Sequence, residues 1–431
     1  MELVSTRDPG RRASFLEAVV ANVPGDGGLF VPARLAPLPP STIATLLAMP
    51  WPERATALLA ELLGDELTRD EIAELTGAAF DFPVPLVRLP DGLAVLELFH
   101  GPSLSFKDFG VRFLARLLAL LARREAAAGR APGPRTVLTA TSGDTGAAVA
   151  LAFHGLPALR VAVLYPRGRI SNRQERQMAT LGGNVRAFAV DGSFDDCQRL
   201  VKASFAAPAL VARHGLVAAN SINIARLLAQ VLYYFEAVAA AGDAPPPVVC
   251  VPSGNFGNLC AGLLARRLGL PLGGLALATN ANTTVPDYLD GGAWRPRPSL
   301  ATLSNAMDVG APSNWERIAW LHGDDREALR AALRWGSLDD DGTRREIARL
   351  AALGYAVDPH GAVASAVLRR LLRPGERGLF LGTAHPAKFE VSGAAVPLPP
   401  PLAAALRRPL LAEPLPATEA ALHAALAAWP V

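Results

Sequence analysis

The apolar and polar positions between residues 93 and 383 follow a repeating order, in which a short apolar run precedes a longer amphipathic stretch. LAVLELF precedes VRFLARLLALLARREAAA, TVLTA precedes GAAVALAFH, and RVAVLYP precedes SNRQERQMATLG. The short apolar runs predict buried strands, and apolar residues spaced three and four apart predict helices. Strands and helices that alternate in this way form parallel βαβ units, so we expect an α/β protein with parallel-type sheets.

A second series of such runs predicts a second α/β domain. INIARLLAQVLYYFEAVAA precedes PVVCVPSG, NLCAGLLARRLG and LALATN follow, and GLFLGTAHP closes the series after a helical stretch at 324–351. We assign residues 85–220 to a smaller domain and 221–395 to a larger one, with a cleft between them. Ligands of such proteins bind where the strands end, and these strand ends would line the cleft.

The two ends of the chain show a different pattern. Residues 1–84 predict a mainly helical segment, with DGGLFVPARLAPLPP as a Gly/Pro-rich connector and helical periodicity in STIATLLAMPWPERATALLAELLG. Residues 396–431 are proline-rich and then helical, which predicts a packed tail rather than a further domain. Neither end contains a motif with evident chemistry.

Composition narrows the classes of protein to which the chain can belong. Of its 431 residues, 51% are apolar and 19% are charged, as in folded globular proteins. The net charge of +3 and the lack of a Lys/Arg block argue against a nucleic-acid partner. Residues such as Glu236 interrupt the apolar segments before they reach the roughly 18 residues of a membrane span. The first residues do not resemble a signal peptide, so we expect no membrane association.

The cysteines give a further indication of location. Cys197, Cys250 and Cys260 occur at spacings that fit neither a CxxC metal site nor a set of disulfides. We therefore expect no metal and a reducing, cytoplasmic location.

Lysine is rare in this chain, and one lysine occupies an unusual place. Of 42 basic residues only Lys107, Lys202 and Lys388 are lysines, so the other 39 are arginines. Arginine keeps its proton because its pKa lies above about 12, whereas a buried lysine can lose its proton and act as an amine nucleophile. Lys107 lies between Phe106 and Asp108 in FHGPSLSFKDFG, shortly after a predicted strand. We infer that it is retained as an amine.

Two glycine-containing loops lie between a predicted strand and a predicted helix. A helix that begins there presents free backbone N–H groups, which can bind an anion. TATSGDTGAAVA offers the hydroxyls of Thr141, Ser142 and Thr145, but Asp144 or Thr145 could equally be a simple helix cap. VPSGNFGNLCAG has two glycines three apart without the Lys-Ser/Thr of a Walker A loop, which favours a compact phosphate site.

A third loop, NSINIARLLAQ, combines polar residues with an arginine. Asn220 and Ser221 could cap a helix, which would place Arg226 near the positive end of that helix. A cation is unfavourable there unless an anion is bound as well. A phosphate would supply that anion, at roughly 1.5–3 kcal/mol for each charge-assisted hydrogen bond.

Three anion sites and one embedded lysine together indicate more than a single phosphate ligand. A phosphorylated cofactor and a substrate with a carboxylate and its own phosphate would occupy all of them. Pyridoxal phosphate fits the lysine, because an amine between Phe106 and Phe109 can have its pKa lowered enough to form a Schiff base.

These motifs together resemble the threonine synthases, a family of fold type II pyridoxal phosphate enzymes. The shared stretches include DGGLFVP, HGPSLSFKDFG, TSGDTGAA, YPRGRISNRQERQ, NSINIARLLAQ, PSGNFGNL, LSNAMDVGAPSNWER, DPHGA and LGTAHPAKF, and they run in order through nearly the whole chain. The longer bacterial and fungal subgroup is the most similar. The resemblance implies a two-domain, tryptophan synthase β-like α/β fold and pyridoxal 5′-phosphate as cofactor.

The resemblance also implies a role for each matching residue. Lys107 would be the Schiff-base lysine and proton shuttle, Thr383 would hydrogen-bond the pyridine nitrogen, and Asp144 would lie beside the 3-hydroxyl of the cofactor. The other residues would bind the cofactor phosphate (Gly254, Asn255, Phe256, Gly257 and Asn258), the substrate carboxylate or nearby atoms (Thr141, Ser142 and Thr145), and the substrate phosphate (Asn220, Ser221 and Arg226).

The implied reaction converts O-phospho-L-homoserine and water to L-threonine and phosphate by β,γ-elimination and replacement. Its rival is a phospholyase that uses the same substrate and releases 2-oxobutyrate, ammonia and phosphate. A catalytically inactive binding protein would have little reason to keep Lys107, Thr383 and the GNFGN loop together. The partner is then a small molecule, and the chain is a monomer or a homodimer.

A few polar residues are expected to serve structure instead. Asp358-Pro359-His360 is interpreted as a turn, and His385 and Lys388 as residues that shape the turn after Thr383. Gln174 and Gln177 share a helix face, from which a substrate contact is possible. Thr283 and Asp287 depart from the pattern of the family in a loop to which we assign no catalytic role.

Overall fold

The computed structural model describes residues 1–129, 135–157, 159–242, 245–390 and 396–429. Its contacts divide into two compact units. The first comprises Met1–Val19, Val23–Gly110 and Ser221–Pro397, and the second comprises Val20–Asn22, Val111–Asn220 and Leu398–Val431. Residues 85–110 thus belong to the unit that also contains the larger sheet. The four-part division expected from the sequence stays a prediction, and its last boundary adjoins residues outside the described part.

The amino-terminal segment contains a small antiparallel sheet as well as helices. The sheet has the order β2-β1-β3, with β1 at Glu2–Ser5, β2 at Arg12–Ser14 and β3 at Phe30–Pro32. The helices are α1 (Phe15–Ala21), α2 (Pro40–Ala48), α3 (Trp51–Leu63) and α4 (Arg69–Ala79). The segment is mainly helical, as expected. The sequence did not predict the small sheet, since strands of three or four residues are too short to show a clear alternation. The predicted helical stretch is split before Pro50, where Met49 is extended as is usual for a residue that precedes proline.

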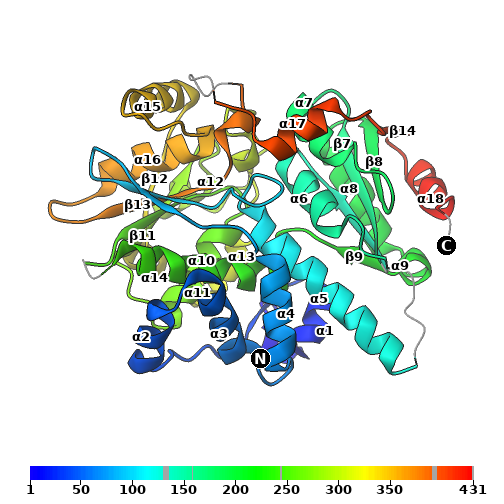
Figure 1. Ribbon diagram of the computed structural model, residues 1–431, viewed down its shortest axis with the longest axis horizontal. Coiled ribbons are helices and arrows are strands. Elements are labelled where there is room, and N and C mark those ends of the chain that lie inside the picture. Colours follow the sequence, from blue (N-terminus) through cyan, green and yellow to red (C-terminus); the bar gives the residue numbers. More distant parts are fainter. Residues whose placement is uncertain (130–134, 158, 243–244, 391–395, 430–431) are drawn as a thin grey trace. The chain divides into compact units, whose positions relative to one another are not determined.

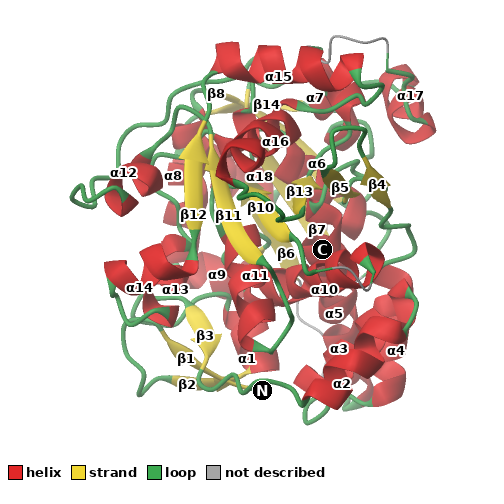
Figure 2. Ribbon diagram, turned by 90° about the vertical axis from the view of Figure 1, so that its left-hand side faces the viewer, coloured by secondary structure: helices red, strands yellow, loops and turns green. Residues whose placement is uncertain are grey.

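The larger sheet lies in the first unit and has six strands in the order β12-β11-β10-β13-β5-β4 (Figure 2). The strands are β4 (Leu86–Arg88), β5 (Ala94–Glu97), β10 (Val248–Pro252), β11 (Gly274–Thr279), β12 (Arg334–Ser337) and β13 (Gly378–Gly382). All neighbouring pairs are parallel except β4 and β5, so the prediction of parallel-type sheets is confirmed. The helical stretch expected at 324–351 was wrong in one respect, because β12 interrupts it.

Helices cover this sheet and form most of the core of the first unit. They are α10 (Ile224–Ala241), α11 (Gly257–Arg267), α12 (Thr284–Leu289), α13 (Trp315–Leu321), α14 (Arg326–Ala332), α15 (Asp340–Ala352) and α16 (Pro359–Leu371), with 3-10 turns η1 (Asn305–Met307) and η2 (Pro386–Lys388). The helix α16 contacts β10, β11, β12 and β13, and α10 packs against α11.

Helix α10 is more apolar than the sequence analysis allowed. Within the described part of the chain it is the one helix long and apolar enough to cross a membrane, and 83% of it is buried inside the protein. Glu236, expected to interrupt the apolar segment, lies on this helix and forms an ion pair with Arg54. Burial of this extent is typical of a core helix.

The second unit contains a fully parallel sheet in the order β14-β8-β7-β6-β9. Its strands are β6 (Arg135–Ala140), β7 (Leu159–Pro166), β8 (Val185–Asp191), β9 (Leu216–Ala218) and β14 (Glu413–Pro416). Its helices are α6 (Asp144–Phe153), α7 (Asn172–Met178), α8 (Phe194–Ala206), α9 (Pro208–His214), α17 (Pro400–Arg407) and α18 (Glu419–Ala427), while α5 (Lys107–Ala127) begins in the first unit and continues into the second.

The tail does more than pack on the surface. Its strand β14 extends the sheet by pairing with β8, next to which it is drawn in red in Figure 1. The sequence did not predict this strand, because Pro414 and Pro416 argue against a strand in the interior of a sheet. Proline is tolerated on an edge strand, which is where β14 lies.

Candidate active site

Lys107 opens α5 directly beside the end of β13. The backbone before Lys107 runs antiparallel to the backbone after β13, with an isolated bridge between Ser105 and Ala384. The N–H of Phe106 donates to the carbonyl oxygen of Thr383 at 2.9 Å, and Lys107 Nζ lies 5.3 Å from the centre of the Phe106 ring. Two residues predicted to act on the same cofactor are thus adjacent.

The turn before Lys107 is held by a buried polar network. Ser103 N donates to Asp108 Oδ2 at 2.9 Å, and the hydroxyls of Ser103 and Ser105 lie 2.9 Å apart. Lys388 Nζ donates to the carbonyl oxygen of Ser103 at 2.8 Å, and Lys388 is 1% exposed. Lys388 therefore supports the turn that presents Lys107, rather than only shaping the turn after Thr383 as the sequence suggested.

The GNFGN loop links β10 to α11 and leaves the start of that helix open. Phe256 adopts the left-handed conformation with φ of +60°, and no side chain caps the helix. The backbone N–H groups of the first turn therefore have no intrahelical acceptor. Gly254 allows a close approach, because a Cβ there would lie 2.6 Å from the carbonyl oxygen of Ala306. Asn255 turns its side-chain oxygen to Ser313, whose N–H donates to Asn255 Oδ1 at 3.3 Å.

Asn258, the last residue of this loop, is aimed by two tyrosines. Its Oδ1 accepts hydrogen bonds from Tyr233 at 2.7 Å and from Tyr234 at 2.8 Å. Burial raises the pKa of both tyrosines well above the ordinary value, so both hydroxyls stay protonated. Asn258 Nδ2 is buried and has no partner within the described residues. An unmet buried donor costs about 1–3 kcal/mol, and a phosphate oxygen would satisfy it.

The GNFGN loop thus fits the phosphate of pyridoxal phosphate on two structural grounds: the uncapped start of α11 and, within the described residues, the unpartnered Nδ2 donor of Asn258. Sequence reasoning missed the tyrosine pair. Two adjacent polar aromatic residues in an otherwise apolar helix were the available signal.

Arg226 lies on α10 where that helix meets the start of α5. A Cβ on Gly110 would lie only 2.9 Å from the carbonyl oxygen of Arg226, so the two helices touch here. Arg226 is 3% exposed, and burial lowers its pKa to about 10. A buried cation in the first turn of a helix is stabilised when an anion binds next to it, as the sequence analysis supposed.

Asn220 and Ser221 lie before α10 and do not cap it. The cap is Asn223, whose side chain accepts a hydrogen bond from Ala225 N at 3.0 Å, so the alternative capping role of Asn220 and Ser221 was wrong. The helix begins at Ile224, which leaves both residues outside the reach of a cap. A Cβ on Gly257 would lie 3.8 Å from the carbonyl oxygen of Ser221, which places Ser221 against the GNFGN loop.

The SGDTG loop belongs to the second unit and begins α6. The cap position is Gly143 with φ of 141°, without a side-chain hydrogen bond, so the alternative of a cap at Asp144 or Thr145 was wrong. Thr141 Oγ1 accepts from Gly143 N at 2.9 Å and from Gly146 N at 2.8 Å. Thr141 therefore closes the loop on itself.

The remaining side chains of this loop differ in accessibility. Asp144 is buried and accepts a hydrogen bond from Gln174 Nε2 at 3.0 Å, so Gln174 orients Asp144. Ser142 is exposed and Thr145 is half-buried. Of the three hydroxyls predicted to meet the substrate, these two are accessible and that of Thr141 is not.

The segment Asp358-Pro359-His360 is the start of α16 rather than a turn. Asp358 caps the helix, and its Oδ2 lies 2.5 Å from His360 Nδ1. His360 Nε2 accepts a hydrogen bond from Ala306 N at 3.2 Å. Because Ala306 also packs against Gly254, this helix start supports the phosphate loop indirectly.

Thr283 and Asp287 interact with each other. Thr283 Oγ1 donates to Asp287 Oδ2 at 3.2 Å, and Arg297 donates to the same oxygen. The two departures from the family pattern thus form one local pair at the start of α12.

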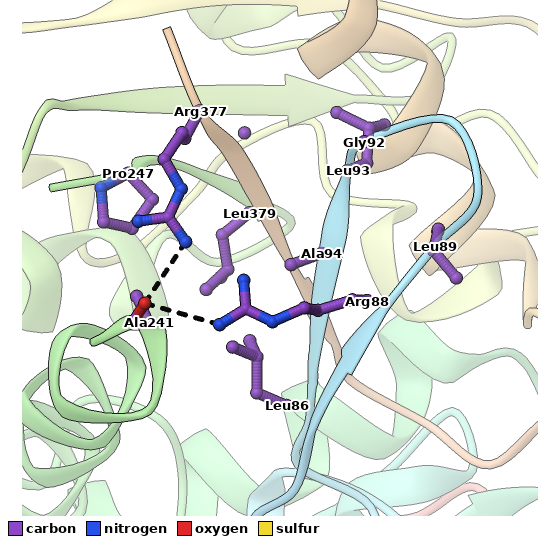
Figure 3. Close-up of a pocket in the computed structure, with 11 residues that line it drawn as sticks. Leu86, Arg88, Leu89, Gly92, Leu93, Ala94, Ala241, Pro247, Arg377 and Leu379 are labelled. Carbon is purple, nitrogen blue, oxygen red and sulfur yellow. Dashed lines mark hydrogen bonds between the residues drawn. The ribbon is translucent and has the colours of Figure 1, made fainter. Parts of the chain in front are cut away.

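A cavity of about 260 Å³ lies at the ends of the strands of the larger sheet that are opposite to Thr383 and the GNFGN loop (Figure 3). Arg88 and Arg377 converge there on the carbonyl oxygen of Ala241, at the strand ends where β13 and β5 begin. Thr383 and the GNFGN loop follow the other ends of the strands. None of the predicted site residues lines this cavity, so it is not the predicted site.

Comparisons with known proteins agree with the arrangement of these loops. Residues 80–381 match the family model described as pyridoxal-phosphate dependent enzyme, and residues 2–80 match the model described as threonine synthase N terminus. The chain is 47% identical over 430 residues to a threonine synthase of Escherichia coli, with 98% of each chain covered.

Two solved structures are similar over the whole chain. The crystal structure of threonine synthase from Escherichia coli gives a TM-score of 0.91 at 46% identity, covering 99% of both chains. A pyridoxal phosphate-bound threonine synthase from Brucella melitensis gives 0.92 at 33% identity, covering 99% of this chain and 98% of that one. The chain therefore belongs to the pyridoxal phosphate-dependent enzymes and, among them, to the threonine synthases.

Proposed function

We propose that the protein converts O-phospho-L-homoserine and water to L-threonine and phosphate, with pyridoxal phosphate held at Lys107 in a fold type II arrangement. The observation that carries the proposal is the position of the segment around Lys107, which contacts Thr383 through Phe106 and Arg226 through Gly110, in the unit that also contains the open GNFGN loop. The phosphate of pyridoxal phosphate would require hydrogen-bond donors in the same unit, and the uncapped start of α11 and Asn258 Nδ2 support that role for the GNFGN loop.

Pyridoxal phosphate, when bound, supplies an electron sink that allows protons to leave carbon atoms next to the substrate amine. Lys107 would hold it through a Schiff base at Nζ. The amide of Asn258 and the N–H groups at the start of α11 would hold its phosphate. Thr383 would place a neutral hydroxyl at the pyridine nitrogen, and Asp144 would lie beside the 3-hydroxyl.

Lys107 would also move protons on the substrate. Its amine, when free, would take a proton from Cα of the substrate and then one from Cβ, and would return protons at Cγ and Cα. Its mobility is restricted by the turn that Ser103, Asp108 and Lys388 hold. Proton transfer between neighbouring carbons requires a base held in such a defined position.

Arg226 would stabilise the phosphate that leaves from Cγ, with Asn220 and Ser221 as further donors. A buried guanidinium at a positive helix end is most effective where negative charge grows during the reaction, which is the case at the leaving phosphate. Ser142 and Thr145 would bind the substrate carboxylate. Water then adds at Cβ, and the product is threonine.

One assay distinguishes this reaction from its rival. Purified protein is incubated with O-phospho-L-homoserine, and threonine, 2-oxobutyrate and phosphate are measured together. We expect threonine and phosphate in equal amounts. Phosphate with 2-oxobutyrate and no threonine would identify a phospholyase instead.

Two substitutions test the assigned roles. Lys107→Ala should abolish both turnover and the absorbance of the bound cofactor near the edge of the visible range; a persistent band would remove Lys107 from the proposal. Arg226→Ala should weaken substrate binding by about tenfold or more while the cofactor stays bound, because it removes a charge-assisted hydrogen bond to the substrate phosphate only. Equal loss of substrate and cofactor would contradict that role.

The proposal includes a cytoplasmic location and a small molecule as the partner. The three cysteines are free and buried, as suits a reducing compartment. Gel filtration with light scattering would decide between the monomer and the homodimer.

A further inference from the structure

One arginine of the first unit is fully buried and is not explained by the reaction. Arg317 on α13 is 0% exposed, and all its hydrogen bonds go to neutral oxygens. Its Nε donates to the carbonyl of Phe30 at 2.9 Å, one terminal nitrogen to Asn314 Oδ1 at 2.6 Å, and the other to the carbonyl of Ile222 at 2.5 Å. No carboxylate forms an ion pair with it in the described ranges.

A buried cation without a carboxylate among its hydrogen-bond acceptors is costly, because burial removes its hydration. The neighbouring Glu316 acts on Arg317 only through space and does not cancel this cost. Burial lowers the pKa of Arg317 to about 10, which remains high enough to keep it charged at neutral pH. Such a charge is more stable when an anion binds nearby. The residues that accept hydrogen bonds from Arg317 adjoin the two loops expected to bind phosphates, and these loops are where such an anion would bind.

Asn314, which Arg317 holds, connects the two phosphate loops. Its backbone N–H donates to the carbonyl of Asn255 at 3.2 Å, and its side-chain Nδ2 lies 3.4 Å from the carbonyl oxygen of Ser221. A Cβ on Gly257 would lie 3.3 Å from the same Nδ2. Asn314 therefore fits between the GNFGN loop and the residue expected to meet the substrate phosphate.

Arg317 fixes the second loop directly as well. Its acceptor Ile222 lies between Ser221 and the helix cap Asn223. By binding the carbonyl oxygen of Ile222, the guanidinium fixes the backbone of this loop just before α10 begins. One side chain thus determines the position of Asn314 and of the loop on which Ser221 lies.

The third acceptor connects the amino-terminal segment to this arrangement. Phe30 belongs to β3, in the segment for which the sequence indicated no chemistry. The neighbouring Glu316 accepts a hydrogen bond from Thr6 at 2.6 Å and so ties the same turn to β1. The amino-terminal sheet therefore contacts and supports the start of α13.

We propose that Arg317 is a positioning residue for both phosphates: it sets the spacing between the cofactor loop and the substrate loop through Asn314 and Ile222, and its buried charge favours anions in both. It touches neither ligand. The inference rests on the proposed function only for the identity of the second phosphate.

The test uses Arg317→Gln, which keeps an amide donor and removes the charge. Pyridoxal phosphate and inorganic phosphate are the probes, so the outcome does not depend on threonine formation. We expect the Kd for pyridoxal phosphate and the Kd for inorganic phosphate, both measured by titration without turnover, each to rise about tenfold. Arg317→Lys, which keeps the charge and loses the planar fork, should lie between the two.

Arg266→Gln is the matched control. Arg266 is a half-buried arginine of the same unit that donates to the carbonyl of Ala332 at 2.8 Å, and it contacts neither phosphate loop. It should leave both binding constants unchanged. Equal shifts in Arg266→Gln and Arg317→Gln would mean that any loss of a buried arginine suffices, which would overturn the proposal.

A spectroscopic measurement separates electrostatics from folding. Loss of a nearby cation raises the second pKa of a phosphate, which is about 6 in ordinary phosphate esters. The ³¹P resonance of the bound cofactor should therefore titrate at higher pH in Arg317→Gln than in the parent protein, and an unchanged profile together with unchanged Kd values would refute the proposal.

If Arg317→Gln does not fold, Asn314→Ala is the test, because it removes the side chain that connects Arg317 to both loops. The affinities for pyridoxal phosphate and for inorganic phosphate should both fall. Affinities equal to those of the parent protein would contradict the proposal.

Discussion

The GNFGN and SGDTG loops have the same sequence design, but the structure uses their backbone donors differently. Each follows a parallel strand, contains two glycines and opens a helix without a side-chain cap. In the SGDTG loop the hydroxyl of Thr141 takes two backbone N–H groups for itself. In the GNFGN loop no side chain does so, and the Nδ2 donor of Asn258 is left without a partner in the described part of the chain.

The difference indicates what each loop can bind. A loop whose donors are already used presents its side chains, and here those are Ser142, Asp144 and Thr145. A loop whose donors are unused presents its backbone, which suits the three oxygens of a phosphate. We therefore expect substitutions in the SGDTG loop to alter stability and substrate contacts, and substitutions in the GNFGN loop to alter cofactor binding.

The largest effect is expected at the glycines. Gly254→Ala would place a Cβ 2.6 Å from the backbone oxygen of Ala306, which cannot move aside as a flexible side chain would. The cofactor loop would shift, and affinity for pyridoxal phosphate should fall by a hundredfold or more when apo protein is titrated with cofactor. Gly146→Ala would collide with Thr141, Met178 and Val163, whose nearest atoms lie at 2.4–2.9 Å, and should cost about 1–3 kcal/mol of stability. If both variants lost only stability, the distinction between the loops would fail.

The next effect is expected at Asn258. Asn258→Asp keeps an acceptor for Tyr233 and Tyr234 and replaces the orphaned donor with negative charge. Repulsion of the phosphate should weaken cofactor binding by tenfold to a hundredfold, since a charge-assisted hydrogen bond contributes about 1.5–3 kcal/mol. Fluorescence titration measures this, and the melting temperature of the apo protein should change little. Cofactor binding equal to that of the parent protein would mean that Asn258 does not face the phosphate.

A smaller effect is expected at Thr141. Thr141→Val keeps the shape of the side chain and removes the hydroxyl, which leaves two backbone N–H groups without an acceptor at a cost of about 1–3 kcal/mol. Thermal denaturation should show a lower Tm, whereas affinity for pyridoxal phosphate should be kept. Thr141→Ser retains the hydroxyl and should behave like the parent. A Val variant with unchanged Tm would show that the loop does not depend on this hydroxyl.

The smallest effect is expected at Ser142. Its side chain is exposed and would bind only the substrate carboxylate, so Ser142→Ala should raise KM a few-fold without altering Tm or cofactor affinity. Steady-state kinetics with O-phospho-L-homoserine would measure it. A change in cofactor affinity would contradict the separation of roles between the two loops.

Much of the fold could be predicted from the sequence, because long apolar and amphipathic runs keep their period whatever surrounds them. The strands that lead into Thr141 and Ser253 were predicted, as were the helices that follow. The short strands β1 to β3 and the edge strand β14 were missed, since three or four residues, or a strand with two prolines, show too little pattern. The alternative capping roles of Asp144 or Thr145 and of Asn220 and Ser221 were wrong, because the choice of cap depends on where a helix begins, and a shift of a few residues changes it.

The sequence by itself determined which chemical groups are present: an isolated lysine, two glycine loops, an arginine near a helix start and a threonine after the last strand of the larger sheet. Only the tertiary structure decided how they are combined. It paired the backbone of Phe106 with that of Thr383, used the hydroxyl of Thr141 inside its own loop, aimed Asn258 with Tyr233 and Tyr234, and buried Arg317 between three carbonyl-bearing segments far apart in the chain. Residue type sets what a group can donate or accept, whereas burial and distance decide which of those donors are left for a ligand.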